Sequence, residues 1–423
     1  MQSVIGSLLY PAPGDPVLKL LSDAGTSGDA ALYAEAARRL IAFGVQHGLD
    51  GNLWQAYLAA HLVTDENPIS RACAFQTLQG SLKTLALACA CVWRKLYHFD
   101  FSAAGKEAAP IFAQLLDMRY PAAETAVGKR LLPLRDQLAA AQDDEAFLTA
   151  LCEYLSANGS GQSALWRAFS VASLEPLRLS PIDAPASVSL DDLIGYEKQK
   201  QAMVDNMEAF LSGQPFNHML LYGDAGTGKS TSVKALLCMY ESRGLRLLEM
   251  RKHQLSALGD AIRMLSGRAN KYMIYMDDLS FEENETGYKN LKAVMEGGVA
   301  QESGNVLLLA TSNRRHLVRE DWKDRSDMEH EGDVHRSDTL EEKLSLAARF
   351  GCAVQFGIPT VRDFDDMVFT LYRRQGGRKL SEEVLRRRAY AFEIRHGGVS
   401  GRTAQQFVNV VLAEEARENG AQE

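Results

Sequence analysis

The chain has few cysteines, and none of them belongs to a C-x-x-C pair. A zinc site or a redox-active dithiol would need that spacing, so nothing in the sequence indicates either. Cys89 and Cys91 lie two residues apart in a helical stretch, which points them to different faces of the helix. We interpret the six cysteines as reduced thiols of the core: Cys73, Cys89, Cys91, Cys152, Cys238 and Cys352.

Long apolar runs are also missing. The longest, residues 85–93, is far shorter than the roughly 20 residues of a membrane span. The N-terminal stretch lacks the basic region of a secretory signal, and Pro11 and Pro13 interrupt it. The net charge is -8, so only a local patch would attract nucleic acid or anionic lipid. We expect a cytoplasmic protein that binds no membrane.

Helical periodicity dominates the first part of the chain. With 423 residues, 46% of them hydrophobic, we expect two or three domains. Residues 1–173 carry apolar side chains three and four positions apart, without a clear strand, which predicts an all-helical N-terminal domain. Within it, Asn67 before Pro68 is typical of a helix start. Residues 174–189 contain three prolines and no regular period, which predicts an extended linker.

The pattern changes after the predicted linker. Over residues 190–358, amphipathic helical stretches alternate with short apolar runs at 218–222, 246–250, 272–276, 306–310 and 353–356. This alternation predicts an α/β domain with a parallel sheet covered by helices. Residues 359–423 are helical again, over 361–375, 382–395 and 402–419, and we predict a helical lid on the sheet domain.

The strongest motif lies between an apolar strand and a helix. Residues 223–230 read Gly-Asp-Ala-Gly-Thr-Gly-Lys-Ser, a full match to the P-loop pattern G-x-x-x-x-G-K-[ST]. The glycines let backbone N–H groups wrap phosphates at the positive end of the helix. We expect Lys229 to neutralise the β- and γ-phosphates and Ser230 to bind Mg²⁺. The other contacts predicted here are Gly223, Asp224, Ala225, Gly226, Thr227, Gly228 and Thr231.

A P-loop requires a second acidic site further along the chain, and Asp277 and Asp278 supply it at the end of the apolar run 272–276. With this pair the sequence resembles the AAA+ ATPases. The resemblance implies that Asp277 supports the metal and that Asp278 polarises the attacking water. That family usually has Glu in the second place, and Asp is one methylene shorter, so Glu282 or Glu283 is an alternative base.

Further segments follow in the order of the same family. Asn313 ends the run that starts at 306 and resembles the first sensor, a polar side chain near the attacking water; its plain alternative is a strand-end turn. Arg402 follows Gly-Gly-Val-Ser-Gly and resembles the second sensor, which reaches the γ-phosphate from the lid. Upstream, Ile194 and Gly195 belong to a segment that resembles the one packing on adenine.

Arg349 lies in the segment Leu-Ser-Leu-Ala-Ala-Arg-Phe-Gly at 344–351. The segment resembles the helix end that carries an arginine finger in AAA+ members of the initiator, helicase-loader and branch-migration kind. Such an arginine acts on the neighbouring subunit's nucleotide and makes hydrolysis depend on assembly. The resemblance therefore implies a homo-oligomer that uses Arg349 in trans. The alternative is an arginine that interacts with its own helix end.

The resemblance runs from Leu193 to about Val411, and within AAA+ it is nearest to a group of bacterial ATP-binding proteins described as a domain of unknown function. Segments 221–224, 277–282 and 310–316 carry that likeness. The charged stretch 314–342, which holds His316, His330 and His335, predicts a mobile solvated insertion rather than a metal site, although Arg314 and Arg315 could contact nucleic acid.

The resulting prediction is an ATPase that uses ATP and Mg²⁺ to remodel or load a protein or nucleic-acid client. We expect the helical N-terminal domain to contact that client. One alternative is a slow nucleotide-dependent switch, which Asp278 in place of Glu favours. The other is a scaffold that only binds nucleotide, which the two sensors and the metal-supporting acid disfavour.

Overall fold

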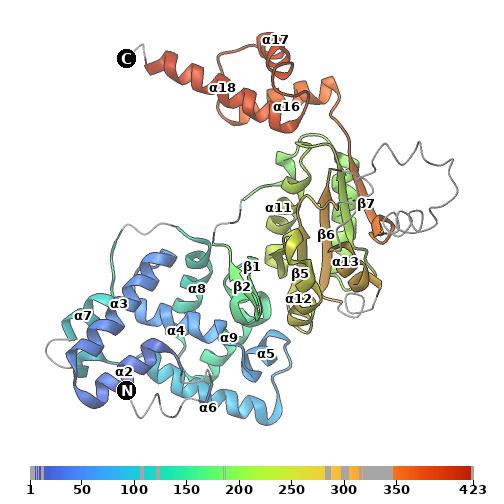
Figure 1. The fold of residues 1–423 in the computed structure, drawn as a ribbon. Helices are drawn as coiled ribbons and strands as arrows, with labels where there is room; N and C mark the ends of the chain where they lie inside the picture. Colours follow the sequence, from blue (N-terminus) through green and yellow to red (C-terminus); the bar gives the residue numbers. More distant parts are fainter. Residues whose placement is uncertain are drawn as a thin grey trace.

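The computed structural model describes residues 14–104, 109–120, 124–183, 187–281, 287–296, 304–313 and 346–420, together with the single residues 5, 7, 9, 10, 185 and 317. Figure 1 shows a helical N-terminal region, a sheet with its helices, and a group of C-terminal helices at the far end of the molecule. The predicted fold class is confirmed, because an α/β P-loop sheet carries a helical lid and follows a helical region.

The N-terminal region packs its helices around one apolar core, in which Trp54, Trp93 and Phe147 are fully buried. Helix α5 begins after Asn67 with Pro68 in its first turn, as the sequence predicts, and Asn67 and Ser70 form a reciprocal capping box there. The helices are α2 (Pro16–Ser27), α3 (Ala30–His47), α4 (Leu53–Thr64), α5 (Pro68–Ala74), α6 (Gly80–Tyr97), α7 (Ala109–Leu115), α8 (Ala126–Ala140) and α9 (Asp144–Asn158).

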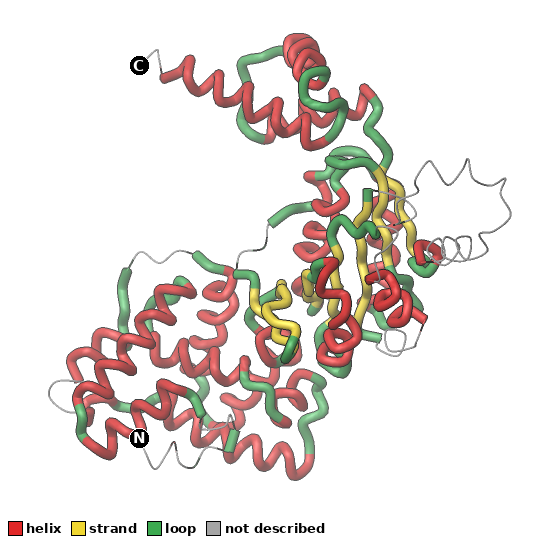
Figure 2. Tube along the Cα trace, in the orientation of Figure 1, coloured by secondary structure: helices red, strands yellow, loops and turns green. Residues whose placement is uncertain are grey.

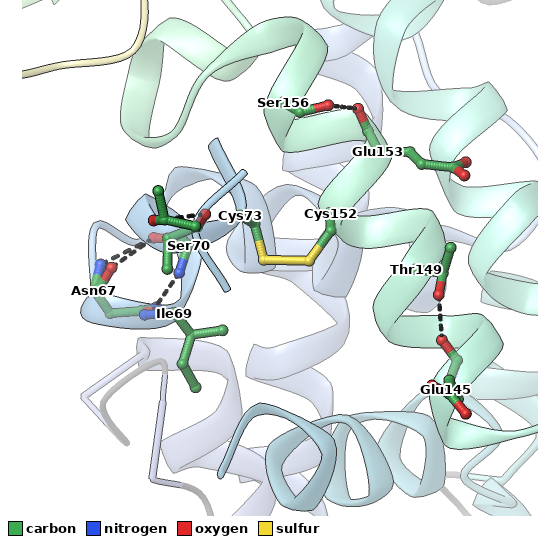
Figure 3. Close-up of a disulfide and its surroundings, with 11 residues drawn as sticks. Asn67, Ile69, Ser70, Cys73, Glu145, Thr149, Cys152, Glu153 and Ser156 are labelled. Carbon is green, nitrogen blue, oxygen red and sulfur yellow. Dashed lines mark hydrogen bonds between the residues drawn. A yellow bond between two sulfur atoms is a disulfide. The ribbon is translucent and has the colours of Figure 1, made fainter. Parts of the chain in front are cut away.

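Two of the cysteines are not thiols. Figure 3 shows a disulfide that joins Cys73 of α5 to Cys152 of α9. The interpretation of all six cysteines as reduced is therefore wrong for this pair. The two residues are 79 positions apart, and they meet because α5 packs on α9. Local spacing in a sequence does not reveal which helices pack together, so the pattern gave no sign of the bond.

In the described part of the chain, the strands form one seven-stranded sheet of order β2-β1-β4-β5-β6-β3-β7. Figure 2 shows the strands in yellow among the red helices. Neighbouring strands are parallel except β1 and β2. The five predicted strands are confirmed as β3 (Met219–Gly223), β4 (Leu245–Glu249), β5 (Lys271–Met276), β6 (Val306–Ser312) and β7 (Cys352–Phe356).

Helices cover both faces of the sheet. On one face α12 (Leu258–Leu265) and α13 (Gly287–Glu296) pack against alternate residues of β6, among them Leu308 and Ala310. On the other face α10 (Glu197–Leu211) and α11 (Lys229–Tyr240) pack against Leu307 and Leu309. Because parallel strands end at one edge, the loops after β3, β5 and β6 meet there.

Strands β1 (Ala168–Leu174) and β2 (Leu177–Pro181) were not expected from the sequence. They form an antiparallel hairpin that extends the sheet through β1 and β4. The predicted linker at 174–189 therefore contains β2, and the predicted all-helical domain at 1–173 ends inside β1. The prolines misled the sequence prediction, because Pro181 ends an edge strand, where a missing N–H is tolerated. The domain boundaries themselves stay a prediction.

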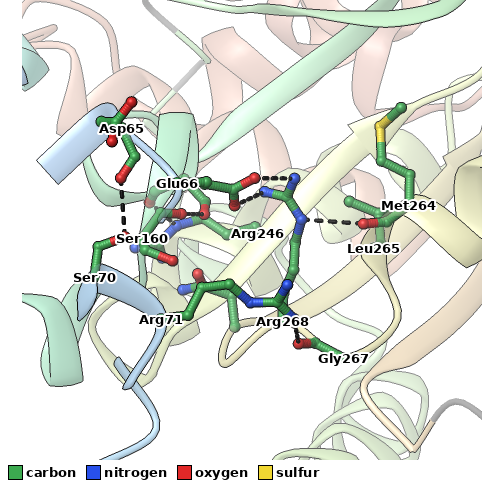
Figure 4. A network of polar contacts seen from close by, with 12 residues as sticks. Asp65, Glu66, Ser70, Arg71, Ser160, Arg246, Met264, Leu265, Gly267 and Arg268 are labelled. Carbon is green, nitrogen blue, oxygen red and sulfur yellow. Dashed lines mark hydrogen bonds and ion pairs between the residues drawn. The ribbon is translucent and has the colours of Figure 1, made fainter. Parts of the chain in front are cut away.

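A buried arginine joins the helical region to the sheet. Arg246 of β4 is 1% exposed, and its guanidinium donates to the backbone carbonyls of Ser163 at 2.8 Å and Asn158 at 2.9 Å. It also donates to the carbonyls of Leu245 and Glu241. Burial lowers the pKa of Arg246 to about 10, so it remains a cation at neutral pH. Figure 4 shows Arg246 beside a second link, the ion pair of Arg268 with Glu66 at 2.8 Å.

The far end of helix α11 also meets the helical region. Glu241 follows the last residue of α11, and its carboxylate forms ion pairs with Arg167 and, at 3.5 Å, with Arg130. Arg130 belongs to α8, so the contact spans the two regions. One helix thus begins at the P-loop and ends against the N-terminal region.

The C-terminal helices are α16 (Val361–Arg374), α17 (Glu382–Glu393) and α18 (Gly401–Gly420). They enclose a small core of their own around Phe364, Val368 and Phe407. Helix α16 starts with a capping box between Thr360 and Asp363. Within the described ranges, no helix combines the length and the apolar character that a membrane crossing requires.

Candidate nucleotide-binding site

The P-loop connects β3 to α11 in a conformation that requires glycine at its ends. Gly223 has φ +136°, and a Cβ on it would lie 1.9 Å from the carbonyl oxygen of Phe356 on β7. Gly228 has φ +96°, and a Cβ there would lie 2.1 Å from the Leu193 side chain. A side chain at Gly223 would push the loop away from β7, and one at Gly228 would push it away from the segment around Leu193. The loop between them presents its backbone at the N-terminus of α11.

Lys229 lies beneath this loop and is 7% exposed. Its Nζ donates to the carbonyls of Gly223 and Asp224, both at 2.7 Å, and to Asn313 Oδ1 at 3.1 Å. Burial lowers the pKa of Lys229, while the negative charges of Asp224, Asp278 and Asp277 oppose that effect. The ammonium is thus held in place by acceptors that an incoming phosphate oxygen can replace.

Ser230 and Asp277 form the acidic side of the site. The Ser230 hydroxyl donates to Asp277 Oδ1 at 2.8 Å, and the Thr311 hydroxyl donates to the same oxygen at 2.6 Å. Burial raises the pKa of Asp277, but hydrogen bonds from Thr311, Tyr275 and Ser230 outweigh burial and leave the pKa below its usual value. Asp277 is therefore ionised at neutral pH.

These oxygen atoms fit a magnesium ion. Mg²⁺ prefers hard oxygen ligands and takes few of them from the protein, the rest being water and phosphate oxygens. The adjacent hydroxyl of Ser230 and carboxylate of Asp277 are such a pair. Among the residues that the structure describes, no three His, Cys, Asp or Glu side chains cluster as a metal site.

Asp278 has a different hydrogen-bond partner from Asp277. Its φ is +49°, an uncommon backbone conformation that short polar residues tolerate. Its Oδ1 accepts a hydrogen bond from Asn313 Nδ2 at 2.9 Å. Since Asn313 Oδ1 also accepts from Lys229, Asn313 connects the P-loop lysine to the second acid. Three polar side chains that follow β3, β5 and β6, those of Lys229, Asp278 and Asn313, are therefore already linked.

The site opens into a cleft of about 780 Å³ between the sheet and the lid. The volume is in the range of small-molecule sites. One wall comes from the P-loop and the acids, and the opposite wall from α16 and the start of α18, where Arg402 and Gln405 lie. At the other end the lining is more apolar, and consists of Val188, Leu193, Ile194, Tyr196, Met367 and Leu371.

A protein family matches this part of the chain. It is described as "Protein of unknown function (DUF815)", and the match covers residues 164–415, more than half of the chain. The chain belongs to the DUF815 family. The matched range includes the hairpin β1-β2, the whole sheet and most of the lid. A search of the curated proteins found no match for this DUF815 protein.

Several solved structures are similar to the DUF815 chain at low identity. The Thermotoga maritima RuvB Holliday junction branch migration motor is 13% identical, with a TM-score of 0.33 over 53% of this chain and 72% of that one. A structure of katanin self-assembly is 18% identical, with a TM-score of 0.34 over 53% and 72%. The Aeropyrum pernix ORC1 protein in complex with DNA is 18% identical, with a TM-score of 0.39 over 53% and 61%.

The structure of this DUF815 member brings most of the predicted site residues together. Lining the cleft are Ile194, Ala225, Gly226, Thr227, Gly228, Lys229, Ser230, Thr231, Asp277, Asp278, Asn313 and Arg402. Gly195, Gly223 and Asp224 do not line it, although the carbonyls of the last two accept from Lys229. Arg402 is near the P-loop, because a Cβ on Gly226 would lie 3.3 Å from the Arg402 Cβ.

Arg349 lies away from the cleft. Its guanidinium forms an ion pair with Glu296, the last residue of α13, and its side chain is 37% exposed. The alternative bases Glu282 and Glu283 lie outside the described residues. So does the charged stretch 314–342 except for Leu317, and with it Arg314, Arg315, His316, His330 and His335.

Some cleft residues were missed by the sequence prediction. Arg374 of α16 lines the cleft and pairs with Asp192 at 3.1 Å, which ties the lid to the segment before α10. Gln375 and Gln405 are polar positions of amphipathic helices, and nothing in the pattern distinguishes them from solvated ones. Thr311 had a detectable signal, since it is a hydroxyl residue at the end of an otherwise apolar strand.

Proposed function

We propose that the protein binds ATP with Mg²⁺ and hydrolyses it to ADP and phosphate. The observation that carries the proposal is the linked set of Lys229, Asn313 and Asp278 beside the Ser230–Asp277 pair, all at the phosphate end of one cleft. A phosphate cradle alone would indicate binding. The additional acid and amide are the groups that water activation requires.

Each group has a role that follows from its place. Lys229 and the P-loop backbone offset the phosphate charge, and Ser230 and Asp277 hold Mg²⁺, which when bound neutralises the β- and γ-phosphate oxygens. Asp278 accepts the proton of the attacking water, and Asn313, whose amide donates to Asp278, helps to orient that water. Arg402 approaches the γ-phosphate from the lid. The apolar end of the cleft, around Ile194, packs on adenine.

The first experiment removes the P-loop cation. Lys229→Ala should weaken ATP binding at least about tenfold and abolish phosphate release, because the ammonium is the main positive charge of the site. Lys234→Ala is the matched control, since Lys234 is an exposed residue of the same helix. Equal nucleotide affinity in the Lys229→Ala variant and the wild type would end the proposal. Circular dichroism and thermal unfolding check that both variants are folded.

We further propose that subunits associate and that Arg349 acts on the neighbour's nucleotide. Its position outside its own cleft supports this role. The Arg349–Glu296 pair does not oppose it, because both side chains are more than one third exposed and such surface pairs contribute little. The helical N-terminal region, anchored through Arg246 and Glu241, is proposed to contact a protein or nucleic-acid client.

A slow nucleotide-dependent switch is the second candidate. The observation in its favour is the short Asp278 side chain, whose Oδ1 already accepts a hydrogen bond from Asn313 at 2.9 Å. Phosphate release should separate the two. A remodelling ATPase turns over faster than about one ATP per second once a polymer client is added, whereas a switch stays slow with every polymer tested and changes its partner affinity between ATP and ADP.

A further inference from the structure

Thr311 occupies the centre of the phosphate end of the cleft. It lies on β6, opposite Leu221 of β3, and follows Ala310, which pairs with Met276 of β5. It is 2% exposed and lines the cleft. The strand therefore brings this side chain between the end of the P-loop strand and the strand that carries the two acids.

The residues before Thr311 on the same face are apolar. Leu307 and Leu309 pack under α10 and α11, and Thr311 continues this alternation at the cleft edge. Valine would fill the same volume and has the same branching at Cβ. The hydroxyl is therefore not needed for packing, and a buried hydroxyl is costly unless it is hydrogen-bonded.

The Thr311 hydroxyl is bonded to both acids at once. It donates to the Asp277 carboxylate at 2.6 Å and accepts from the backbone N–H of Asp278 at 2.9 Å. The second bond holds the backbone where Asp278 adopts its positive φ. One hydroxyl thus fixes the side chain of the first acid and the main chain of the second.

The two hydrogen bonds of the Thr311 hydroxyl help to determine which partner each acid meets. Asp277 Oδ1 receives hydrogen bonds from Thr311 and Ser230, so the carboxylate is held toward Ser230. The bond to the backbone N–H of Asp278 holds the turn from which the Asp278 carboxylate accepts from Asn313. One hydroxyl therefore helps to hold Asp277 at Ser230 and Asp278 at Asn313.

We infer that Thr311 is a positioning residue for ATP hydrolysis, which separates a metal-supporting Asp277 from a water-activating Asp278. The inference rests on the proposed function. Thr311 acts at the step in which both acids are used and not on the binding of the nucleotide itself. The metal requirement and the turnover number should depend on the Thr311 hydroxyl. The affinity for nucleotide in the absence of metal should not depend on it.

Thr311→Val tests the inference, because it removes the hydroxyl and keeps the shape. We expect kcat to fall about tenfold and the Mg²⁺ concentration for half-maximal turnover to rise about fivefold, in line with the loss of a hydrogen bond to a charged group. KM for ATP and the affinity for ADP in EDTA should stay within about twofold of wild type. Thr311→Ser, which keeps the hydroxyl, should restore most of kcat.

The controls separate positioning from stability. Thr64→Val removes a threonine hydroxyl that bonds only its own helix carbonyl in α4, and should leave kcat and the Mg²⁺ dependence unchanged. Mn²⁺ binding in the presence of ADP, followed by electron paramagnetic resonance, gives a readout that needs no hydrolysis. We expect it to weaken in Thr311→Val and to recover in Thr311→Ser.

The results distinguish a failure of the inference about Thr311 from a failure of the proposed function. Wild-type kcat, Mg²⁺ dependence and Mn²⁺ affinity in a folded Thr311→Val variant would overturn the inference and leave the proposed function standing. A Thr311→Ser variant as impaired as Thr311→Val would also overturn it, since shape and not the hydroxyl would then matter. A wild type that binds no nucleotide would refute the proposed function, and this inference with it.

Discussion

Asp277 and Asp278 are neighbours in the chain with different surroundings. The first accepts bonds from Ser230 and Thr311, and the second accepts from Asn313. The charge of Asp277 is held where a cation fits, whereas that of Asp278 is next to the Asn313 amide. Two carboxylates with different surroundings can serve different steps of one reaction.

Amide substitutions should therefore give two different defects. Asp277→Asn should raise the Mg²⁺ concentration needed for turnover by about tenfold, because a neutral amide supports a cation poorly. Asp278→Asn should bind Mg-ATP normally and slow hydrolysis about a hundredfold, since its role begins only with the water. Steady-state kinetics with titrated Mg²⁺ measures both. If Asp278→Asn turns over normally while Glu282→Gln does not, the base is Glu282.

His218 should make stability depend on pH. Its Nδ1 accepts from the Leu308 N–H at 3.2 Å, and burial lowers its pKa from 6.5 to about 4. The unfolded chain therefore binds the proton more readily than the folded one. The stability contributed by neutral His218 is full above pH 6.5 and is lost as the pH falls from there toward 4.

The expected loss between pH 7 and pH 5 is roughly 2 kcal/mol. His218→Asn keeps an acceptor near the position of Nδ1 and does not titrate in this range. We would measure the free energy of unfolding of both proteins in urea at pH 7 and at pH 5. The decrease should be roughly 2 kcal/mol smaller in His218→Asn than in the wild type. Equal pH dependence in the two proteins would show that His218 is not responsible.

Residues of the site were predictable where a motif fixes their spacing. Lys229, Ser230 and the two acids follow from the P-loop pattern and an acidic strand end. The sequence did not predict the cleft positions of Thr311, Arg374 and Gln405. Their place in the cleft depends on how the strands and the lid pack together and not on neighbouring residues in the chain. The same limit applies to Arg349, whose partner Glu296 lies 53 positions earlier.

Among the elements, long periodic helices and fully buried strands were found from the sequence close to their observed ends. Strand β6, for example, is apolar over Val306–Ala310 because both faces are covered. Strands β1 and β2 were missed because they lie at the sheet edge and are partly exposed, so polar residues and prolines interrupt their pattern. Pairing with β4 stabilises β1, and that partner is far along the chain.

The junction between the elements β4 and α9 depends on Arg246. Arg246→Met should lower the free energy of unfolding by about 3 kcal/mol or more, because the carbonyls of Ser163 and Asn158 would be buried without donors. Arg243→Met is the matched control, since Arg243 pairs with Glu208 on the surface and should change stability by less than about 1 kcal/mol. Urea unfolding of both variants checks this. Equal losses would contradict a special role for the buried cation.

For the whole molecule, the central expectation is that hydrolysis depends on assembly. Turnover per subunit should rise with protein concentration, because Arg349 lies outside its own cleft and is proposed to complete the site of a neighbour. Arg349→Ala should lose this rise and still bind ATP. Analytical ultracentrifugation alongside phosphate release measures both quantities.

Mixing inactive variants gives the sharper test of the same expectation. Lys229→Ala subunits retain Arg349, and Arg349→Ala subunits retain an intact P-loop. A mixture should recover part of the wild-type activity, since each variant supplies the group that the other lacks. A monomer with turnover linear in concentration and no recovery on mixing would leave Arg349 as an ordinary helix-end residue and favour the slow switch.

The carbonyl groups around Arg246 also bear on how the protein is made. Arg246 follows Ser163 by 83 residues, so a ribosome adding about 5 to 20 residues per second needs roughly 4 to 17 seconds between them. During that interval the helical region is complete, its docking carbonyls have no cation, and β1 has no parallel neighbour. An open strand edge on a nascent chain can pair with other chains. The passage from β2 to β4 is thus a stretch of translation in which this protein is exposed to aggregation.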